Sequence, residues 1–217
     1  MKKIILPLFI VILISLTFAG CNSNSTANAT NDTVNSVSQS MDNVGTMLNG
    51  MDNSNDINKI DTTTNNMVSE SGLLQQQIIQ YKEDILAKKQ AVIQNYQKNV
   101  ALGKEIAEKR VTIKNLVAKI KDSQKQLTAD DLSKVKAQAQ TINEDVSSLT
   151  STNSAISDDF ITVIKDIGTR SFEKIKTDLD NIAAIQNERT KALNKLSADM
   201  DTMIKSLQTA MTNAKIS

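Results

Sequence analysis

The sequence has no histidine and no tryptophan, and its 217 residues include only one proline, one cysteine, six glycines and six aromatic side chains (two tyrosines and four phenylalanines). Without histidine, the commonest general base and transition-metal ligand is missing. A single cysteine cannot form an intramolecular disulfide. Because helix breakers are so rare, the composition favours an all-α protein whose slender core is made of aliphatic residues and methionine.

Motifs for catalysis or cofactor binding are also lacking. There is no glycine-rich phosphate loop, no zinc-ligand spacing and no nucleophile elbow. The acidic pair Asp130/Asp131 suits the first turn of a helix, and the pair Asp158/Asp159 lacks the oxygen-rich loop of a calcium site. We therefore predict no enzyme activity, no cofactor and no metal. The formal net charge of +1 gives no reason to expect a nucleic-acid partner.

Residues 1–20 have the layout of a secretory signal peptide. Two lysines precede an apolar run over residues 4–18, which is shorter than the ~20 residues of a typical spanning helix. The following Leu-Thr-Phe-Ala-Gly-Cys, which ends at Cys21, resembles the lipobox of bacterial lipoproteins, with Phe18 where that family usually has leucine. An ordinary signal peptide with an incidental cysteine and an uncleaved membrane helix are the alternatives.

The lipobox resemblance implies that Cys21 receives a diacylglyceryl group and becomes the N-terminus after cleavage. Two acyl chains give durable anchoring where a single chain is marginal. We therefore expect a lipid anchor that holds the chain to the cell membrane on its extracytoplasmic face.

Residues 21–70 differ abruptly from the rest, because they are rich in asparagine, serine, threonine and aspartate. Such a segment buries too little apolar surface to offset the entropy of ordering, so we expect a disordered tether of roughly 40 Å root-mean-square span. A short helix over residues 33–51 remains open, because six apolar residues there keep steps of three and four: Val34, Val37, Met41, Val44, Leu48 and Met51.

The most regular stretch runs from Leu132 to Ile167. Its apolar residues alternate in steps of three and four for five heptads, the pattern of a coiled-coil seam, and Asn153 is the only polar residue in the series. The apolar members are Leu132, Val135, Ala139, Ile142, Val146, Leu149, Ile156, Phe160, Val163 and Ile167.

Similar spacing on both sides predicts a bundle over residues 71–217. We expect helices over about 72–126, 129–167 and 170–214, with Thr128 capping the second helix. Short connections make consecutive helices antiparallel, so the fold class is all-α: an elongated antiparallel three-helix coiled-coil bundle after a disordered N-terminal tether. A dimer that exchanges helices between chains is the alternative.

Charge is unevenly distributed along this bundle. Residues 71–127 carry eleven cationic and five acidic side chains, whereas residues 128–167 carry three and seven. This contrast favours pairing of the first helix with the second. The alternative is a basic face of the first helix that meets anionic lipid or a wall polymer.

Three polar residues interrupt the seams at matching heights when the chain is folded at its two turns. We predict a hydrogen-bonded layer of Asn99, Asn153 and Gln186, with Arg189 one turn away. Such layers cost stability but fix helix register. The alternative is that these side chains face solvent where the seam loosens.

The same alignment leaves residues 73–87 of the first helix without a facing second helix. Six of them would form an exposed apolar interaction patch, covered by the 34–51 segment, another subunit or a partner. They are Leu73, Leu74, Ile78, Ile79, Ile85 and Leu86.

The layout of lipid anchor and helical ectodomain is similar to that of several surface lipoproteins, including cell-wall-binding lipoproteins of Gram-positive bacteria. The likeness is one of class, because no motif assigns residues. We expect a non-enzymatic spacer, scaffold or partner-binding module at the cell envelope, with a protein or envelope-polymer partner or a homo-oligomer. The alternative is a membrane-active or membrane-coating helical effector.

Overall fold

The computed structural model describes residues 25–70, 76–169 and 171–217. Within these ranges it describes the side chains of all residues except 25, 26, 70 and 76–80. The described chain consists of helices and the short turns between them, so the all-α prediction is confirmed. The helices are α1 (Ser25–Asn49), α2 (Ser54–Glu70), α3 (Gln76–Ser123), α4 (Ala129–Gly168) and α5 (Phe172–Asn213).

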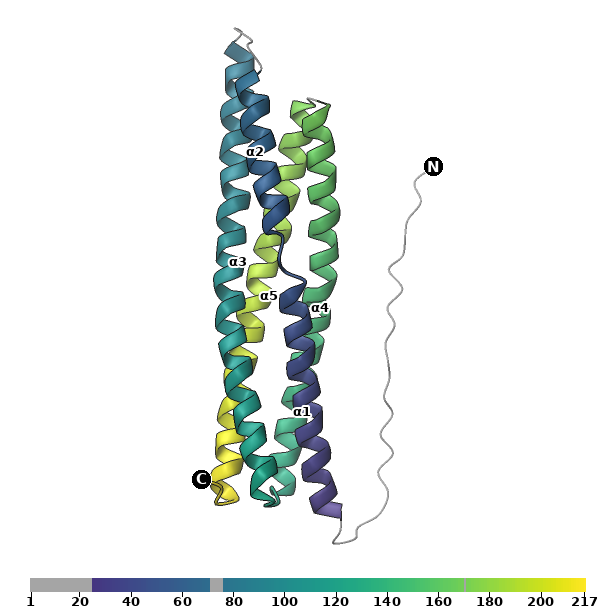
Figure 1. Cartoon of the computed structure of the whole chain (residues 1–217), viewed down its shortest axis with the longest axis vertical. Coiled ribbons are helices and arrows are strands. Elements are labelled where there is room, and N and C mark those ends of the chain that lie inside the picture. Colours follow the sequence, from purple (N-terminus) through teal and green to yellow (C-terminus); the bar gives the residue numbers. More distant parts are fainter. Residues whose placement is uncertain (1–24, 71–75, 170) are drawn as a thin grey trace, which may run out of the picture.

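The helices form a long four-helix bundle, in which α1 and α2 together occupy one of the four positions (Figure 1). The helix α5 packs against both α3 and α4, and α1 followed by α2 packs between α3 and α4 on the opposite side. In the described part of the chain, α3 and α4 do not pack directly against each other. The predicted three long helices and their order are present, and the N-terminal segment supplies the fourth layer.

A helical N-terminal segment corrects the prediction of a disordered tether over residues 21–70. From residue 25 onward the segment is helical except at a short break, and its apolar stripe is buried. Asparagine, serine and threonine are poor helix formers, but tertiary packing of an amphipathic face outweighs propensity. The helix left open over residues 33–51 is present and starts earlier.

A shift in the apolar spacing places the break between α1 and α2. Val44, Met47 and Met51 are buried at helical spacing, but the next buried residues are Asn53 and then Ile57. A step of two residues turns a helix by about 200°, so one continuous helix would point one of the two stripes away from the core. The non-helical residues 52 and 53 absorb this mismatch.

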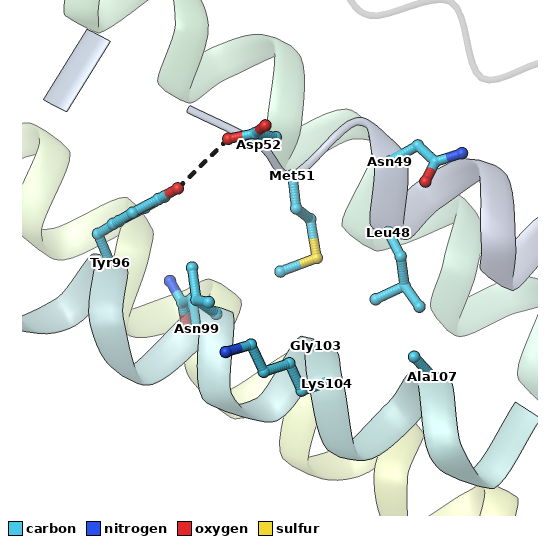
Figure 2. Close-up of a pocket in the computed structure, with 10 residues that line it drawn as sticks. Leu48, Asn49, Met51, Asp52, Tyr96, Asn99, Gly103, Lys104 and Ala107 are labelled. Carbon is cyan, nitrogen blue, oxygen red and sulfur yellow. Dashed lines mark hydrogen bonds between the residues drawn. The ribbon is translucent and has the colours of Figure 1, made fainter. Parts of the chain in front are cut away.

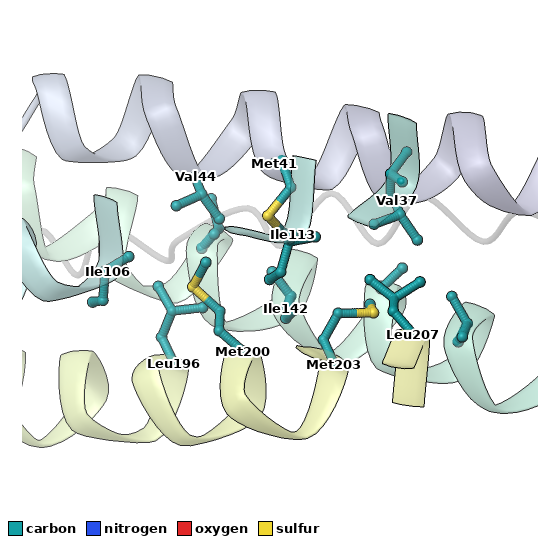
Figure 3. Close-up of a cluster of buried hydrophobic side chains, with 14 of the residues drawn as sticks. Val37, Met41, Val44, Ile106, Ile113, Ile142, Leu196, Met200, Met203 and Leu207 are labelled. Carbon is teal, nitrogen blue, oxygen red and sulfur yellow. The ribbon is translucent and has the colours of Figure 1, made fainter. Parts of the chain in front are cut away.

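The core beside α1, which we call the lower cluster, draws on all four layers (Figure 3). Val37, Met41 and Val44 of α1 face Ile113 of α3 and Met200 of α5, and all five residues are 0% exposed. All ten apolar seam residues predicted between Leu132 and Ile167 are buried, either in this cluster or in the part of the core beside α2.

A second core, the upper cluster, lies beside α2. Its members from the N-terminal segment are Ile57, Ile60 and Met67, which pack with α3, α4 and α5. Two of its α4 members, Ile156 and Phe160, are completely buried. The two clusters contain no residue in common, and polar side chains occupy the bundle between them.

The turn from α3 to α4 has the predicted cap. The Thr128 hydroxyl accepts a hydrogen bond from the Asp131 backbone N–H at 3.1 Å and donates one to the Asp131 carboxylate at 2.7 Å. Gln124, at φ 55°, takes the left-handed conformation that ends many helices. These local features reverse the chain and place α3 and α4 antiparallel.

Candidate functional site

The predicted polar residues lie at mid-height, between the two apolar clusters and beside the break. Asn99 and Gln186 are 1% and 0% exposed, and Asn153 is half-buried. The Asn99 amide donates to the Gln186 backbone carbonyl at 3.2 Å, and the Thr190 hydroxyl donates to Asn99 Oδ1 at 2.7 Å. The structure therefore brings Asn99 and Gln186 together across α3 and α5, but through the Gln186 backbone. The predicted layer of three bonded side chains is wrong, because the Gln186 amide has no partner and Asn153 bonds Arg189 and Met47 instead.

Asn153 belongs to a second pair at the same level, which involves Arg189. The Arg189 guanidinium donates to Asn153 Oδ1 at 2.6 Å, and the Asn153 amide donates to the Met47 carbonyl at 3.3 Å. Met47 lies in the last turn of α1, where the helix dipole is negative. Asn153 thus links a buried cation to the negative end of α1.

Arg189 is unusual because it is only 1% exposed and has no carboxylate partner in the described part of the chain. Burial lowers the pKa of Arg189 to about 10, so the side chain still carries its charge at neutral pH. Its Nε has no hydrogen-bond partner, and the same is true of both polar atoms of the Gln186 amide. The layer is consequently polar but incompletely satisfied, and the end of α1 is its main source of negative charge.

The break opens a cavity of about 280 Å³ between α1 and α3 (Figure 2). Leu48 and Met51 extend from the N-terminal segment toward Gly103 of α3. At the rim, the Tyr96 hydroxyl donates to the Asp52 carboxylate at 3.4 Å. Burial, together with the Asp52 charge, raises the pKa of Tyr96, so its hydroxyl remains a donor at neutral pH.

On the α4 side of the same break lies a wider groove of about 770 Å³, and most of the residues that line it have polar side chains. Asp52 and Asp56 are the charged residues of this lining, which contains no lysine or arginine. Hydrogen bonds from the Ser54 hydroxyl and backbone N–H lower the pKa of Asp52. The groove therefore carries negative charge at neutral pH. Its lining residues are Asn43, Thr46, Met47, Asn49, Gly50, Asp52, Asn53, Asp56, Asn143, Val146, Ser147, Thr150, Asn153, Ser154 and Ser157.

The sequence named Asn153 and Arg189 but missed the break. Asp52 and Asn53 lie in a segment whose composition predicted disorder, so no role was assigned to them. The two-residue step from Met51 to Asn53, where the preceding steps are three or four, is the signal that could have located the break.

The predicted apolar patch lies at the upper end of α3, and the structure describes part of it. Leu73 and Leu74 lie outside the described residues, as do the side chains of Ile78 and Ile79. Ile85 is completely buried in the upper cluster.

The overhang expected over residues 73–87 is therefore shorter than predicted. Leu86 is half-buried, and Tyr81 stacks on Phe172 of α5 with ring centroids 6.2 Å apart. Lys176 of α5 also lies 3.2 Å from the Asp84 carboxylate. The prediction considered the 34–51 segment, another subunit or a partner as the cover for this stretch, whereas α5 and α2 both lie beside it.

Several basic side chains of α3 pair within the chain, but not with the acidic second helix as predicted. Lys88 and Lys109 bind Asp180 and Asp201 of α5, each pair at 2.7 Å or less. Toward the N-terminal segment, cations of α3 pair with Asp42 of α1 and Asp61 of α2. The partners differ from the prediction because α1 and α2 separate α3 from α4.

The Asp42 pairs fasten α1 to α3. Lys114 lies 2.6 Å from the Asp42 carboxylate, and this contact lowers the pKa of Asp42. Arg110 donates to the Met41 carbonyl at 2.5 Å and lies across Gly45, where a Cβ atom would come within 2.9 Å of the guanidinium. A glycine at position 45 therefore leaves the room that the Arg110 side chain needs.

Among the described residues, no helix combines the length and apolarity needed to cross a membrane, and no group of three or more acidic or thiol side chains is placed to hold a metal. Cys21 lies outside the described residues. Comparisons with family models, curated proteins and solved structures give no match for this chain.

Proposed function

We propose that this protein is a non-enzymatic lipoprotein of the cell envelope, anchored through Cys21, whose helical rod acts as a spacer, scaffold or partner-binding module on the extracytoplasmic face. The observation that carries the proposal is the closeness of the lipobox-like cysteine to the first helix. Only three residues separate Cys21 from Ser25, where α1 begins. At most about 14 Å of extended chain would therefore join the acyl chains to the bundle.

This closeness changes the role expected of the N-terminal segment. A flexible tether would let the folded part move freely above the membrane, whereas a link of three residues holds the start of α1 at the lipid surface. The rod itself then supplies the reach: 48 residues of α3 correspond to about 72 Å. The start of α1 and the turn from α3 to α4 lie at one end of the rod, and the end of α2 and the start of α3 lie at the other (Figure 1).

The ion pairs of several α3 cations support a spacer or binding module over a membrane-coating effector. Lys88, Lys89, Lys109 and Lys114 are each within 2.8 Å of an acidic side chain of this chain. An effector that coats anionic membranes would need such charges free to meet lipid headgroups. The partner we propose is an envelope protein or polymer.

Metabolic labelling tests the anchor directly. Cells that produce the chain are given a radiolabelled fatty acid, and the protein is then isolated and fractionated between membrane and medium. We expect label and membrane association for the natural chain and for the matched variant Ser23→Ala, and loss of both for Cys21→Ala. An unlabelled natural chain, or label that persists in Cys21→Ala, would refute the proposal.

Vesicle leakage separates the two functions. The purified chain is added to dye-loaded anionic vesicles at low salt. A spacer or binding module leaves the dye inside, and rapid release at low protein concentration would favour the membrane-active effector instead.

A further inference from the structure

We propose that the cavity between α1 and α3 at the helix break is a binding site for a small uncharged aromatic molecule of one or two rings. The site is independent of the lipid anchor proposed above, because it is formed by the end of α1, the break and the middle of α3. Three features point to this ligand: the size and apolar walls of the cavity, a helical glycine that packing does not require, and a mouth whose charges are of opposite sign.

The walls of the cavity are apolar on both sides. Leu48 and Met51 line it from the N-terminal segment, and α3 contributes Val100, Gly103 and Ala107. An apolar protein cavity of roughly 150 Å³ holds a benzene ring, so about 280 Å³ has room for two fused rings. The Met51 side chain extends toward α3 (Figure 2), and a thioether sulfur makes favourable contacts with aromatic rings. Size and lining therefore suit a compact aromatic molecule.

Gly103 keeps this space open although packing does not demand a glycine there. Glycine is the poorest helix former after proline, and Gly103 lies in the middle of α3. A Cβ atom at this position would lie 3.6 Å from Leu48 Cδ2 and 3.9 Å from Met51 Cε, which are ordinary contact distances. At Gly45, by contrast, a Cβ atom would come within 2.9 Å of the Arg110 guanidinium. Packing thus explains the glycine of α1, whereas the glycine of α3 supplies room in the cavity.

The mouth of the cavity carries one charge of each sign. Asp52 and Lys104 are exposed there, and neither forms an ion pair in the described part of the chain. Asp52 repels an anionic ligand and Lys104 repels a cationic one, so the mouth favours a neutral molecule. Asp52 accepts hydrogen bonds from the Ser54 N–H and the Tyr96 hydroxyl, and its carboxylate has capacity for a further donor such as a ring N–H.

Titration of the full chain with indole tests the site, in neutral detergent micelles and with the free indole concentration measured by dialysis. Methionine methyl groups labelled with ¹³C are the reporters in NMR spectra. We expect the Met51 methyl resonance to shift saturably, with a Kd on the order of 1 mM or lower. The resonances of Met200 and Met203, which are buried in the lower cluster, should hardly move. An unmoved Met51 resonance, or equal shifts of all three, would overturn the proposal.

Matched variants of α3 locate the binding. Gly103→Leu places a side chain in the cavity, and we expect the indole affinity measured at Met51 to fall at least about tenfold. Ala101→Leu adds a side chain of the same size at an exposed position of the same helix and should leave the affinity within about twofold. Unchanged affinity in Gly103→Leu, or equal losses in the two variants, would overturn the site.

Gly103→Ala separates the packing of the glycine from its role in the cavity. The added methyl group improves helix propensity and meets its neighbours at ordinary distances, so the melting temperature should rise. A lower melting temperature would mean that packing requires the glycine and would overturn the argument from space. Should Gly103→Leu fail to fold, Ala107→Leu fills the cavity from the next turn of α3, and a folded Ala107→Leu chain that binds indole as tightly as the natural chain would overturn the site.

Analogues of indole test the chemical class of the ligand. Indole-3-acetate and tryptamine add a negative and a positive charge, and we expect neither to bind more tightly than indole. Cyclohexanol keeps a hydrogen-bond donor but has no aromatic ring, and it should bind at least severalfold more weakly. A charged analogue that binds about tenfold more tightly than indole, or cyclohexanol that binds as tightly, would overturn the assignment of a neutral aromatic ligand.

Discussion

The half of the rod beside α1 and the half beside α2 share the same heptad spacing. They differ in which seam positions of the N-terminal helices carry apolar side chains. In α1 the stripe over Val34–Val44 is apolar at each seam position, and cations of α3 hold its outer side. In α2 the stripe contains Thr64, which is 0% exposed and whose hydroxyl has no hydrogen-bond partner. The completely buried hydroxyl of α1, that of Ser40, donates to the Ser36 and Ala139 carbonyls at 3.0 and 3.3 Å, whereas the completely buried hydroxyl of α2 has no partner.

Charge deepens this contrast. At the upper end, Asp159, Asp166 and Asp178 lie close enough to influence one another, and burial together with hydrogen bonding and repulsion from Asp166 raises the pKa of Asp178. The lower half places acidic groups against lysines, as in the network of Lys109 with Glu105 at 2.8 Å and Asp201 at 2.7 Å. The upper half has such pairs as well, for example Lys88 with Asp180 at 2.5 Å, so its difference is confined to the group of Asp159, Asp166 and Asp178. A rod whose halves are separated by a polar layer can open at one end first, and these differences identify the α2 end as the weaker one.

The largest test uses the same residue type in the same helix on either side of the layer. Ile142 and Ile156 of α4 are both completely buried, one in the lower cluster and one in the upper. Replacing either by alanine should cost about 2–5 kcal/mol. We expect Ile142→Ala to lower the stability of the whole rod, and Ile156→Ala to open the α2 end first.

Hydrogen exchange with mass spectrometry distinguishes these outcomes, because it reports α1 and α2 separately. In Ile156→Ala, peptides of α2 should exchange faster while those of α1 keep their protection. Equal acceleration of α1 and α2 in both variants would show a single cooperative unit and would contradict the comparison.

The next test concerns the layer that joins the halves. A leucine at a polar seam position ordinarily stabilises a coiled coil, but here Asn153→Leu removes the acceptor of the buried Arg189 guanidinium and the donor to Met47. We expect a loss of about 2–3 kcal/mol in urea unfolding. The control Arg189→Met removes the charge itself and should be neutral or stabilising. If Asn153→Leu raised the stability, the link from Arg189 to α1 would be unimportant.

A smaller change should reduce the difference between the halves. Thr64→Val keeps the shape of the side chain and removes the hydroxyl that lacks a partner, so α2 should gain about 1 kcal/mol. The matched control is Thr141→Val at an exposed position of α4, where the hydroxyl bonds its own helix and little should change. Exchange protection of α2 is the measurement, and unchanged or weaker protection in Thr64→Val would show that the buried hydroxyl is not what weakens this end.

Much of the bundle follows from local spacing, and the remainder depends on what lies opposite. The seam from Leu132 to Ile167 is buried where the heptad pattern places it, and the Thr128 cap is present, because both are decided by residues a few positions apart. Whether α1 and α2 are ordered depends on a groove between α3 and α4 that no local pattern reveals.

The candidate site divides in the same way. Asn99 and Gln186 could be aligned because each interrupts a regular seam, and the two turns fix how the seams meet. The partner of Asn153 could not be found, since Met47 belongs to a segment whose composition predicted disorder. The groove at Asn53 depends on the break, and the break depends on a change of phase between two stripes that are individually short and weak.

The smallest effect concerns pH and the acidic end. Because the pKa of Asp178 is raised in the folded chain, the folded state binds a proton more readily than the unfolded state, and stability rises as the pH falls through that raised value. Above that pH, the charged carboxylate weakens the upper half.

Asp178→Asn should therefore stabilise the α2 end at pH 7, by less than about 1 kcal/mol. It should also remove the part of the acid stabilisation that this group supplies between neutrality and pH ~4. Melting curves from pH 7 to pH 4 measure this, with Asp32→Asn in α1 as the exposed control. The contrary result is a natural chain whose melting temperature falls as the pH first drops below neutrality. It would mean that cations stabilise the charged carboxylates at this end, and that the two halves do not differ in charge as argued.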